Sequence, residues 1–150
     1  MHQTELQPLL TEFAADRLAL LIRHEAGARA VSHYDFNNTY QYVISRGETQ
    51  ITWLQTALAE YNVPLPPASS TIPVPELPKR TGKNDAATFR AVLEDDARHL
   101  GAFVEKWRPI VHGITHARHR IMLIKNYLSC FNSGKKSDHF ISFTRTLKGV

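Results

Sequence analysis

Apolar residues recur every three or four positions in four separate stretches of the chain, a spacing that places them on one face of an α-helix. Capping residues such as Asn84 precede these stretches, and a stop signal at residues 132–134 follows the last one. Pro109 separates the last two stretches, because proline breaks or kinks a helix. The pattern predicts helices over about residues 4–33, 39–62, 85–107 and 110–131. We therefore expect an all-α protein, an antiparallel four-helix bundle within residues 1–134.

A proline-rich segment, residues 63–83, separates the second predicted helix from the third. Its prolines preclude a helix and favour an extended chain. About 20 extended residues can span roughly 30 Å, the length of a helix, so the segment can carry the chain back to the other end of a bundle. Ile72, Val74 and Leu77 offer apolar anchors for such an ordered crossover. A disordered linker between two helical hairpins is the alternative.

The third predicted helix carries an acid in the middle of its apolar face. Its apolar positions are Phe89, Val92, Leu93, Leu100, Phe103, Val104 and Trp107. Asp96 lies at the centre of this face, and His99 lies at its edge. A buried carboxylate without a partner costs several kcal/mol, so Asp96 requires a partner, a metal ion or a proton.

Candidate partners for Asp96 lie on the first predicted helix. Arg17 and His24 interrupt its inward face, and Asp16 lies at the edge of that face. A site with Asp96, His99, His24 and Asp16 can hold one metal ion, since mixed imidazole and carboxylate ligands suit iron, manganese or zinc. Alternatively, Asp96 forms a structural pair with a histidine or with Arg17, whose guanidinium would leave no room for a metal ion.

The second predicted helix matches the third in pattern at an offset of 49 residues. In that alignment Gly47 falls on Asp96 and Gln50 falls on His99. Glycine inside a helix lowers stability by about 1 kcal/mol relative to alanine, so either a large group packs against Gly47 or a former side chain has been lost. Shared helical periodicity and an ancestral duplication both explain the match.

The segments EDDARHLGAFVEKW and SRGETQITWLQTAL resemble the metal-bearing helices of ferritin-like and rubrerythrin-like di-iron bundles, which carry Glu-x-x-His motifs. Asp96 and His99 fit that motif in type, whereas Gly47 and Gln50 fit only in position. The resemblance implies a ferritin-like bundle with a degenerate di-iron site, acting mainly as an oligomeric or partner-binding protein without catalytic activity. It also implies an alternative, a reduced iron, manganese or zinc site at Asp96 and His99 with a redox or oxidative-stress role.

Three histidines of the fourth predicted helix, His112, His116 and His119, follow i, i+4, i+7 spacing. Their face lies opposite the apolar stripe, which includes Ile110 and Ile121, so we expect them to be solvent-exposed. The alternative is a metal site, either at a subunit contact or as a mononuclear site similar to that of DinB-like bundles.

Composition and the remaining segments indicate where the protein is found and what it can contact. The single cysteine, Cys130, excludes an intrachain disulfide and fits a reducing compartment, so we expect the cytoplasm. No apolar run is long enough to span a bilayer, and the first residues lack the basic region of a signal peptide. Residues 135–150 form a basic tail, which we interpret as a solvated terminus, and no nucleic-acid-binding signature accompanies it. Trp53 lies off the apolar stripe, which favours a homodimer or a partner surface.

Overall fold

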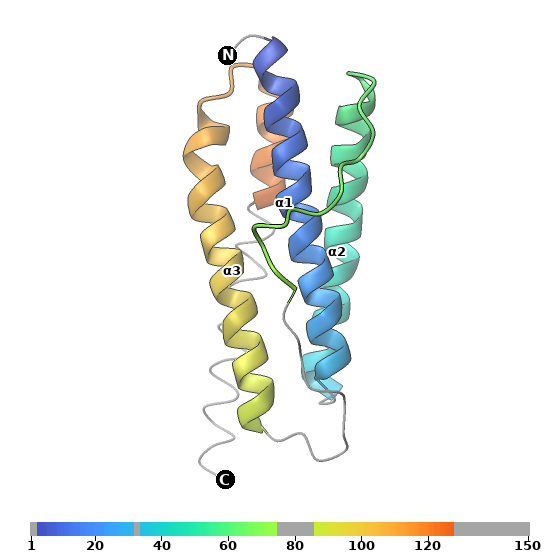
Figure 1. Ribbon diagram of the computed structural model, residues 1–150, viewed down its shortest axis with the longest axis vertical. Coiled ribbons are helices and arrows are strands. Elements are labelled where there is room, and N and C mark those ends of the chain that lie inside the picture. The colour runs from blue at the N-terminus through green and yellow to red at the C-terminus, as the bar shows by residue number, and fades with distance from the viewer. Residues whose placement is uncertain (1–2, 32–33, 75–85, 128–150) are drawn as a thin grey trace.

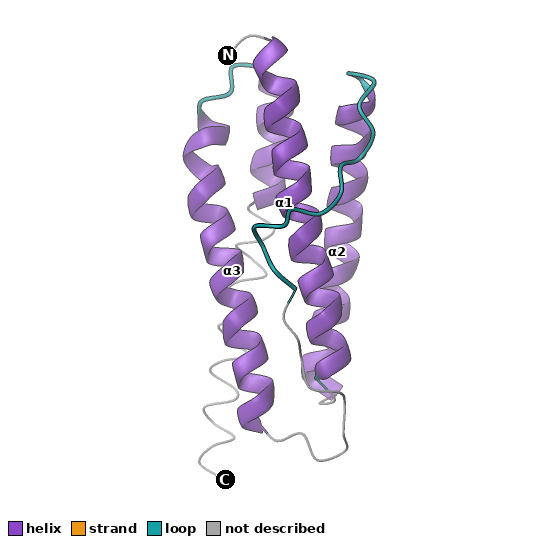
Figure 2. Ribbon diagram, in the orientation of Figure 1, coloured by secondary structure: helices purple, strands orange, loops and turns teal. Residues whose placement is uncertain are grey.

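The computed structural model describes residues 3–31, 34–74 and 86–127 (Figure 1). These residues form α1 (Gln3–Ala30), α2 (Tyr34–Ala59), α3 (Ala86–His112) and a further helix that begins at residue 117 and is described to residue 127. We call the last one helix 117–127. The described residues contain no strand (Figure 2). The predicted all-α architecture with four helices is confirmed. None of the described helices is both long and apolar enough to cross a membrane.

The core forms around α1, which packs against both α2 and α3. Figure 1 shows the helices side by side along one long axis. Against α3, the ring of Phe13 makes edge-to-face contacts with Phe103 and Trp107, at centroid distances of 5.2 and 5.0 Å. Helix 117–127 is tied to the end of α2, because both guanidinium NH₂ groups of Arg118 donate to Glu60 at 2.5 and 2.7 Å. Most residues of the apolar stripes predicted for the first three helices are buried in the structure.

The boundary between the third and fourth helices differs from the prediction. α3 continues through Pro109 to His112, and the next helix starts at residue 117 instead of 110. The four intervening residues break the helical phase, so the stripe predicted for one continuous helix from Ile110 is wrong at Ile110 and Ile121. Ile110 and Ile121 are 37% and 50% exposed. The buried residues of this region are Val111, Ile114, His119, Leu123, Asn126 and Tyr127.

The same change of phase separates the three histidines. His112 and His116 are exposed, as predicted, but His119 is buried, and for His119 the prediction is wrong. The His119 ring stacks on His116 at 4.3 Å and contacts the ring of Tyr61 at 5.8 Å. His112 instead bonds through Nε2 to Tyr127 Oη at 2.7 Å.

The described part of the proline-rich segment, residues 63–74, lies along α1 without forming a helix (Figure 1). The Ser69 backbone N–H donates to the Ala15 carbonyl at 3.0 Å, and Arg23 donates to the Pro73 carbonyl. Ile72 is partly buried against the core, but Val74 is 48% exposed and does not act as an anchor. Leu77, the remainder of the predicted crossover, Cys130 and the basic tail at 135–150 lie outside the described residues.

We predict a pH-dependent stability that originates at His119. Burial, with His116 and Arg118 nearby, lowers the pKa of His119; Glu60, 3.5 Å from its Nε2, opposes this shift without outweighing it. The unfolded chain therefore binds more protons between the two pKa values. The free energy of unfolding should be at its full value above pH 6.5 or so, the pKa of an unfolded histidine, and should fall as the pH drops through the folded pKa.

Urea unfolding between about pH 7.5 and 5.5 measures this effect. His119→Gln should reduce the loss of stability on acidification, whereas Thr52→Val, at an exposed threonine, should leave it as in the parent. An unaltered pH dependence in His119→Gln would contradict the assignment.

Candidate functional site

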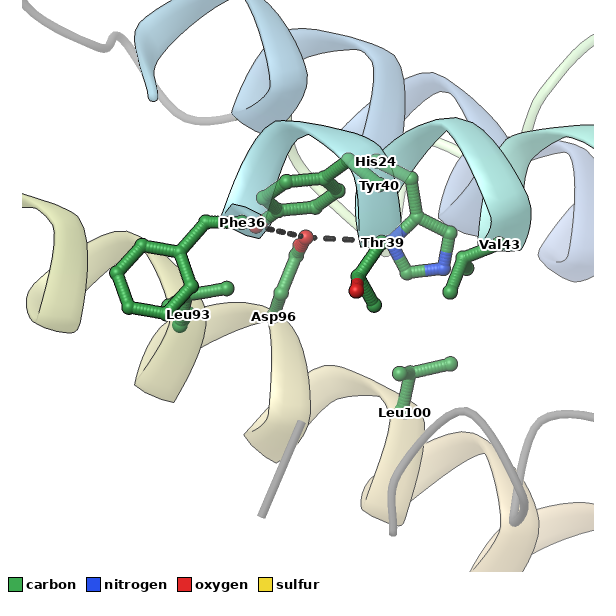
Figure 3. A pocket seen from close by; sticks show the side chains of 8 residues that line it. All are labelled: His24, Phe36, Thr39, Tyr40, Val43, Leu93, Asp96 and Leu100. Carbon is green, nitrogen blue, oxygen red and sulfur yellow. Dashed lines mark hydrogen bonds and ion pairs between the residues drawn. The ribbon is translucent and has the colours of Figure 1, made fainter. Parts of the chain in front are cut away.

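Three polar side chains from three helices meet in the core of the bundle (Figure 3). The Asp96 carboxylate of α3 lies with its Oδ2 3.1 Å from His24 Nδ1 of α1 and accepts a hydrogen bond from Tyr40 Oη of α2 at 2.9 Å. His24 is 1% exposed, and Tyr40 and Asp96 are each 5% exposed. Of the partners that the sequence left open, His24 therefore pairs with Asp96. We call this group the Asp96 cluster.

Tyr40 reaches Asp96 because α1 has a glycine at the point of contact. A Cβ atom at Gly27 would lie 2.6 Å from Tyr40 Oη and 2.8 Å from Cζ, which is closer than side-chain atoms pack. Burial raises the pKa of Tyr40 well above its usual value, and the negative charge and hydrogen bond of Asp96 raise it further. The phenol therefore keeps its proton and serves as a donor to the carboxylate.

Arg23 provides a second layer around the Asp96 cluster. Its side chain is 2% exposed, with Nε 3.4 Å from Asp96 Oδ1, and it also donates to Asp95 and to the Pro73 carbonyl. Burial raises the pKa of Asp95, but the hydrogen bonds from Arg23 and Arg98 outweigh burial and lower it overall. The sequence analysis missed Arg23. A usable signal was its position seven residues after Asp16, which places both on the same edge of α1.

Arg17 does not pair with Asp96. Its guanidinium donates to Gln50 Oε1 from Nε at 3.2 Å and from Nη2 at 2.8 Å, and its side chain is 2% exposed. A Cβ at Gly47 would lie 3.2 Å from Arg17 Nη2 and 3.0 Å from Leu21 Cδ1. The large side chains that pack against Gly47 are thus Arg17 and Leu21. Arg17 Nη1 has no hydrogen-bond partner in the structure.

The other predicted metal ligands lie apart from the Asp96 cluster. Asp16 is buried elsewhere between α1 and α3, where its Oδ2 accepts hydrogen bonds from Trp107 Nε1 at 2.9 Å and Lys106 Nζ at 2.8 Å. His99 is half-buried, with Nδ1 2.8 Å from the Asp95 carbonyl oxygen. Of the predicted set Asp96, His99, His24 and Asp16, the structure brings only Asp96 and His24 together.

No group of three His, Cys, Asp or Glu side chains that could hold a metal ion is found among the described residues. This statement covers the histidines at 112, 116 and 119 as well as the Asp96 cluster. His24 and Tyr40 bond to the Asp96 carboxylate, and Arg23 places a positive charge beside it. The arrangement neutralises a buried acid, and it presents no nucleophile to solvent.

We predict that Gly27→Ala destabilises the protein by about 1–3 kcal/mol, because the new methyl group forces Tyr40 away from Asp96. Gly101→Ala, on α3, is the matched control: a Cβ there meets nothing within 4 Å. Since alanine favours a helix by up to about 1 kcal/mol over glycine, the control should raise stability. Urea unfolding of both variants tests the pair, and a Gly27→Ala protein as stable as the parent would contradict the contact.

We also predict that replacing both Arg17 and Gln50 with apolar residues preserves stability, whereas replacing only one of them lowers it. Gln50→Leu should cost about 3–5 kcal/mol, since it leaves a buried guanidinium without its acceptor. The double variant Arg17→Met with Gln50→Leu should match the parent or exceed it by about 1–4 kcal/mol, because it removes both polar groups. Denaturant unfolding separates the cases; a double variant no more stable than Gln50→Leu would show that the charge itself is required.

Comparison with known proteins gives no family for the chain. No protein-family model matches it, and no curated protein or solved structure is significantly similar to it. A functional assignment therefore depends on the buried contacts and on the exposed surface.

Proposed function

We propose that the chain is a ferritin-like, antiparallel four-helix bundle whose di-iron site is replaced by side-chain hydrogen bonds, and that it acts in the cytoplasm as a homodimer without catalytic activity. The observation that carries the first part is the packing of Arg17 against Gly47. When α2 is aligned with α3 at an offset of 49 residues, Gly47 and Gln50 occupy the positions of Asp96 and His99. These are the positions at which ferritin-like bundles carry metal ligands.

The residues present do not fit a di-iron centre. Gly47 has no ligand atom, and the Gln50 side-chain oxygen accepts from Arg17. A guanidinium at this place repels a divalent cation strongly, because the interior screens charges weakly. On the other half of the site, Arg23 and Tyr40 already engage the Asp96 carboxylate.

The exposed face of α2 and helix 117–127 supports the second part. Tyr42 and Trp53 are 44% and 41% exposed and lie eleven residues apart on α2, so they share one face. Ile121, 50% exposed, lies on helix 117–127. Two hollows of about 210 and 270 Å³ adjoin Trp53 and lie between these helices. Exposed aromatic and aliphatic side chains around such hollows are typical of protein interfaces.

The charges on this face favour a second copy of the same chain. Arg46 lies seven residues before Trp53 on the same side of α2, and Glu60 lies seven residues after Trp53, directly beyond the end of the helix. If two α2 helices pack in opposite directions about a two-fold axis at Trp53, Arg46 of each copy lies opposite Glu60 of the other. Glu60 also bonds to Arg118 of its own chain, which holds the carboxylate in place. The face is therefore complementary to itself.

The dimer is tested by light scattering after size-exclusion chromatography, together with sedimentation equilibrium. We expect a dimer for the parent, a monomer for Trp53→Ser, and weakened association for Arg46→Glu. Val74→Ser is the matched control, because Val74 is also exposed but lies away from this face. A monomeric parent, or a Trp53→Ser variant that remains a dimer, would exclude this interface.

Elemental analysis tests the loss of metal chemistry. Protein produced with added iron, manganese and zinc should contain far less than one metal ion per chain, and Asp96→Ala should leave that content unchanged. One metal ion per chain that disappears in Asp96→Ala would instead support the reduced metal site predicted at Asp96 and His99. A metal lost in His116→Ala and retained in Asp96→Ala would support the DinB-like alternative.

A further inference from the structure

A small cavity lies directly in front of His24 in the bundle core (Figure 3). Phe36, Thr39, Tyr40, Val43, Leu93, Asp96 and Leu100 complete its lining. Its volume is about 10 Å³. That volume matches the lower limit for one water molecule, which needs roughly 10–15 Å³, and it excludes larger ligands.

The His24 side chain directs an unused hydrogen-bonding atom into this region. Its Nδ1 bonds to Asp96, but Nε2 is buried and has no hydrogen-bond partner in the structure. The carboxylate of Asp96 can only accept, so Nδ1 carries a proton, and in the neutral imidazole Nε2 then carries a lone pair. A buried acceptor that finds no donor destabilises the fold, because it has lost the hydrogen bond it made to water. Figure 3 shows the two ring nitrogens on different sides of His24, one toward Asp96 and the other toward Val43.

We propose that this cavity is a binding site for one internal water molecule, which donates a hydrogen bond to His24 Nε2. The Thr39 hydroxyl lines the same cavity and supplies a second polar contact. Polar cavities of this size hold water bonded to buried groups, whereas apolar cavities stay empty. The bound water extends the chain of contacts from Tyr40 through Asp96 and His24 to Thr39. This inference does not depend on the dimer or on the loss of metal chemistry.

The site rejects the other ligands that a free imidazole nitrogen attracts. A metal ion at Nε2 would need further ligands, and the remaining lining is apolar apart from Thr39, Tyr40 and Asp96. Tyr40 keeps its proton, and Asp96 is engaged by Arg23 and Tyr40. A hydrogen-bond donor of water's size is the ligand that satisfies Nε2 without disturbing these contacts.

Nuclear magnetic resonance on the full chain with ¹⁵N-labelled histidine tests the site. Long-range proton–nitrogen correlation should show His24 as the neutral tautomer protonated at Nδ1, with Nε2 shifted in the direction of a hydrogen-bond acceptor. Cross-relaxation should connect water, with the sign of a long-lived internal molecule, to the methyl groups of Val43, Leu93 and Leu100.

Thr39→Val keeps the shape of the side chain and removes the second polar contact, so the water signals should weaken or vanish and the Nε2 shift should move toward that of a free nitrogen. Thr52→Val, at an exposed threonine of the same helix, is the matched control and should change neither. A proton on Nε2, or a parent protein whose cavity methyl groups show no contact with water, would overturn the proposal.

Discussion

The burial of the Asp96 carboxylate is the constraint on which the rest of the core depends. A carboxyl group that is 5% exposed is tolerated only when polar partners surround it. α1 contributes Arg23 and His24, and α2 contributes Tyr40. One side chain on α3 therefore fixes how α1 and α2 are rotated and where they lie along the bundle axis. Apolar side chains alone tolerate sliding by a turn, but a buried carboxylate does not. Gly27 follows from this constraint, because any side chain there would displace Tyr40.

α1 carries further buried polar residues that contact the neighbouring helices, and two of them are seven residues apart. Asp16 and Arg23 lie on the edge that faces α3, where they contact Trp107 and Asp96 respectively. Arg17, on the neighbouring edge, bonds to α2 through Gln50. Buried polar contacts contribute little net stability compared with apolar packing of the same volume, but they penalise every alternative register. We infer that the polar residues of α1 specify how the helices align, which explains why so many of them are buried in a small bundle.

Helical periodicity was sufficient to predict the four helices and the inward position of Asp96, and it named His24 as one of the candidate partners of that acid. It failed where a local break changes the phase: the turn after His112 rotates the following helix, which buries His119 and exposes Ile121. It also failed for long side chains. Arg17 and Arg23 both start near the edge of the apolar face, and the residue that each guanidinium reaches depends on interhelical distances that a helical wheel does not contain. Gly47 was the informative clue, since a glycine on the inward face of a helix leaves space, which Arg17 and Leu21 fill.

α2 connects the interior to the proposed interface. Its inward face carries Tyr40 and Gln50, which bond to α3 and α1, and its outward face carries Tyr42 and Trp53. Because the inward hydrogen bonds allow one rotation of α2, they also fix the direction in which Trp53 projects. A side chain held in this way loses little conformational freedom when a second molecule covers it, so more of the interaction energy remains as affinity. In the function that we propose, the polar core therefore has a second role, since it orients the surface through which two copies would assemble.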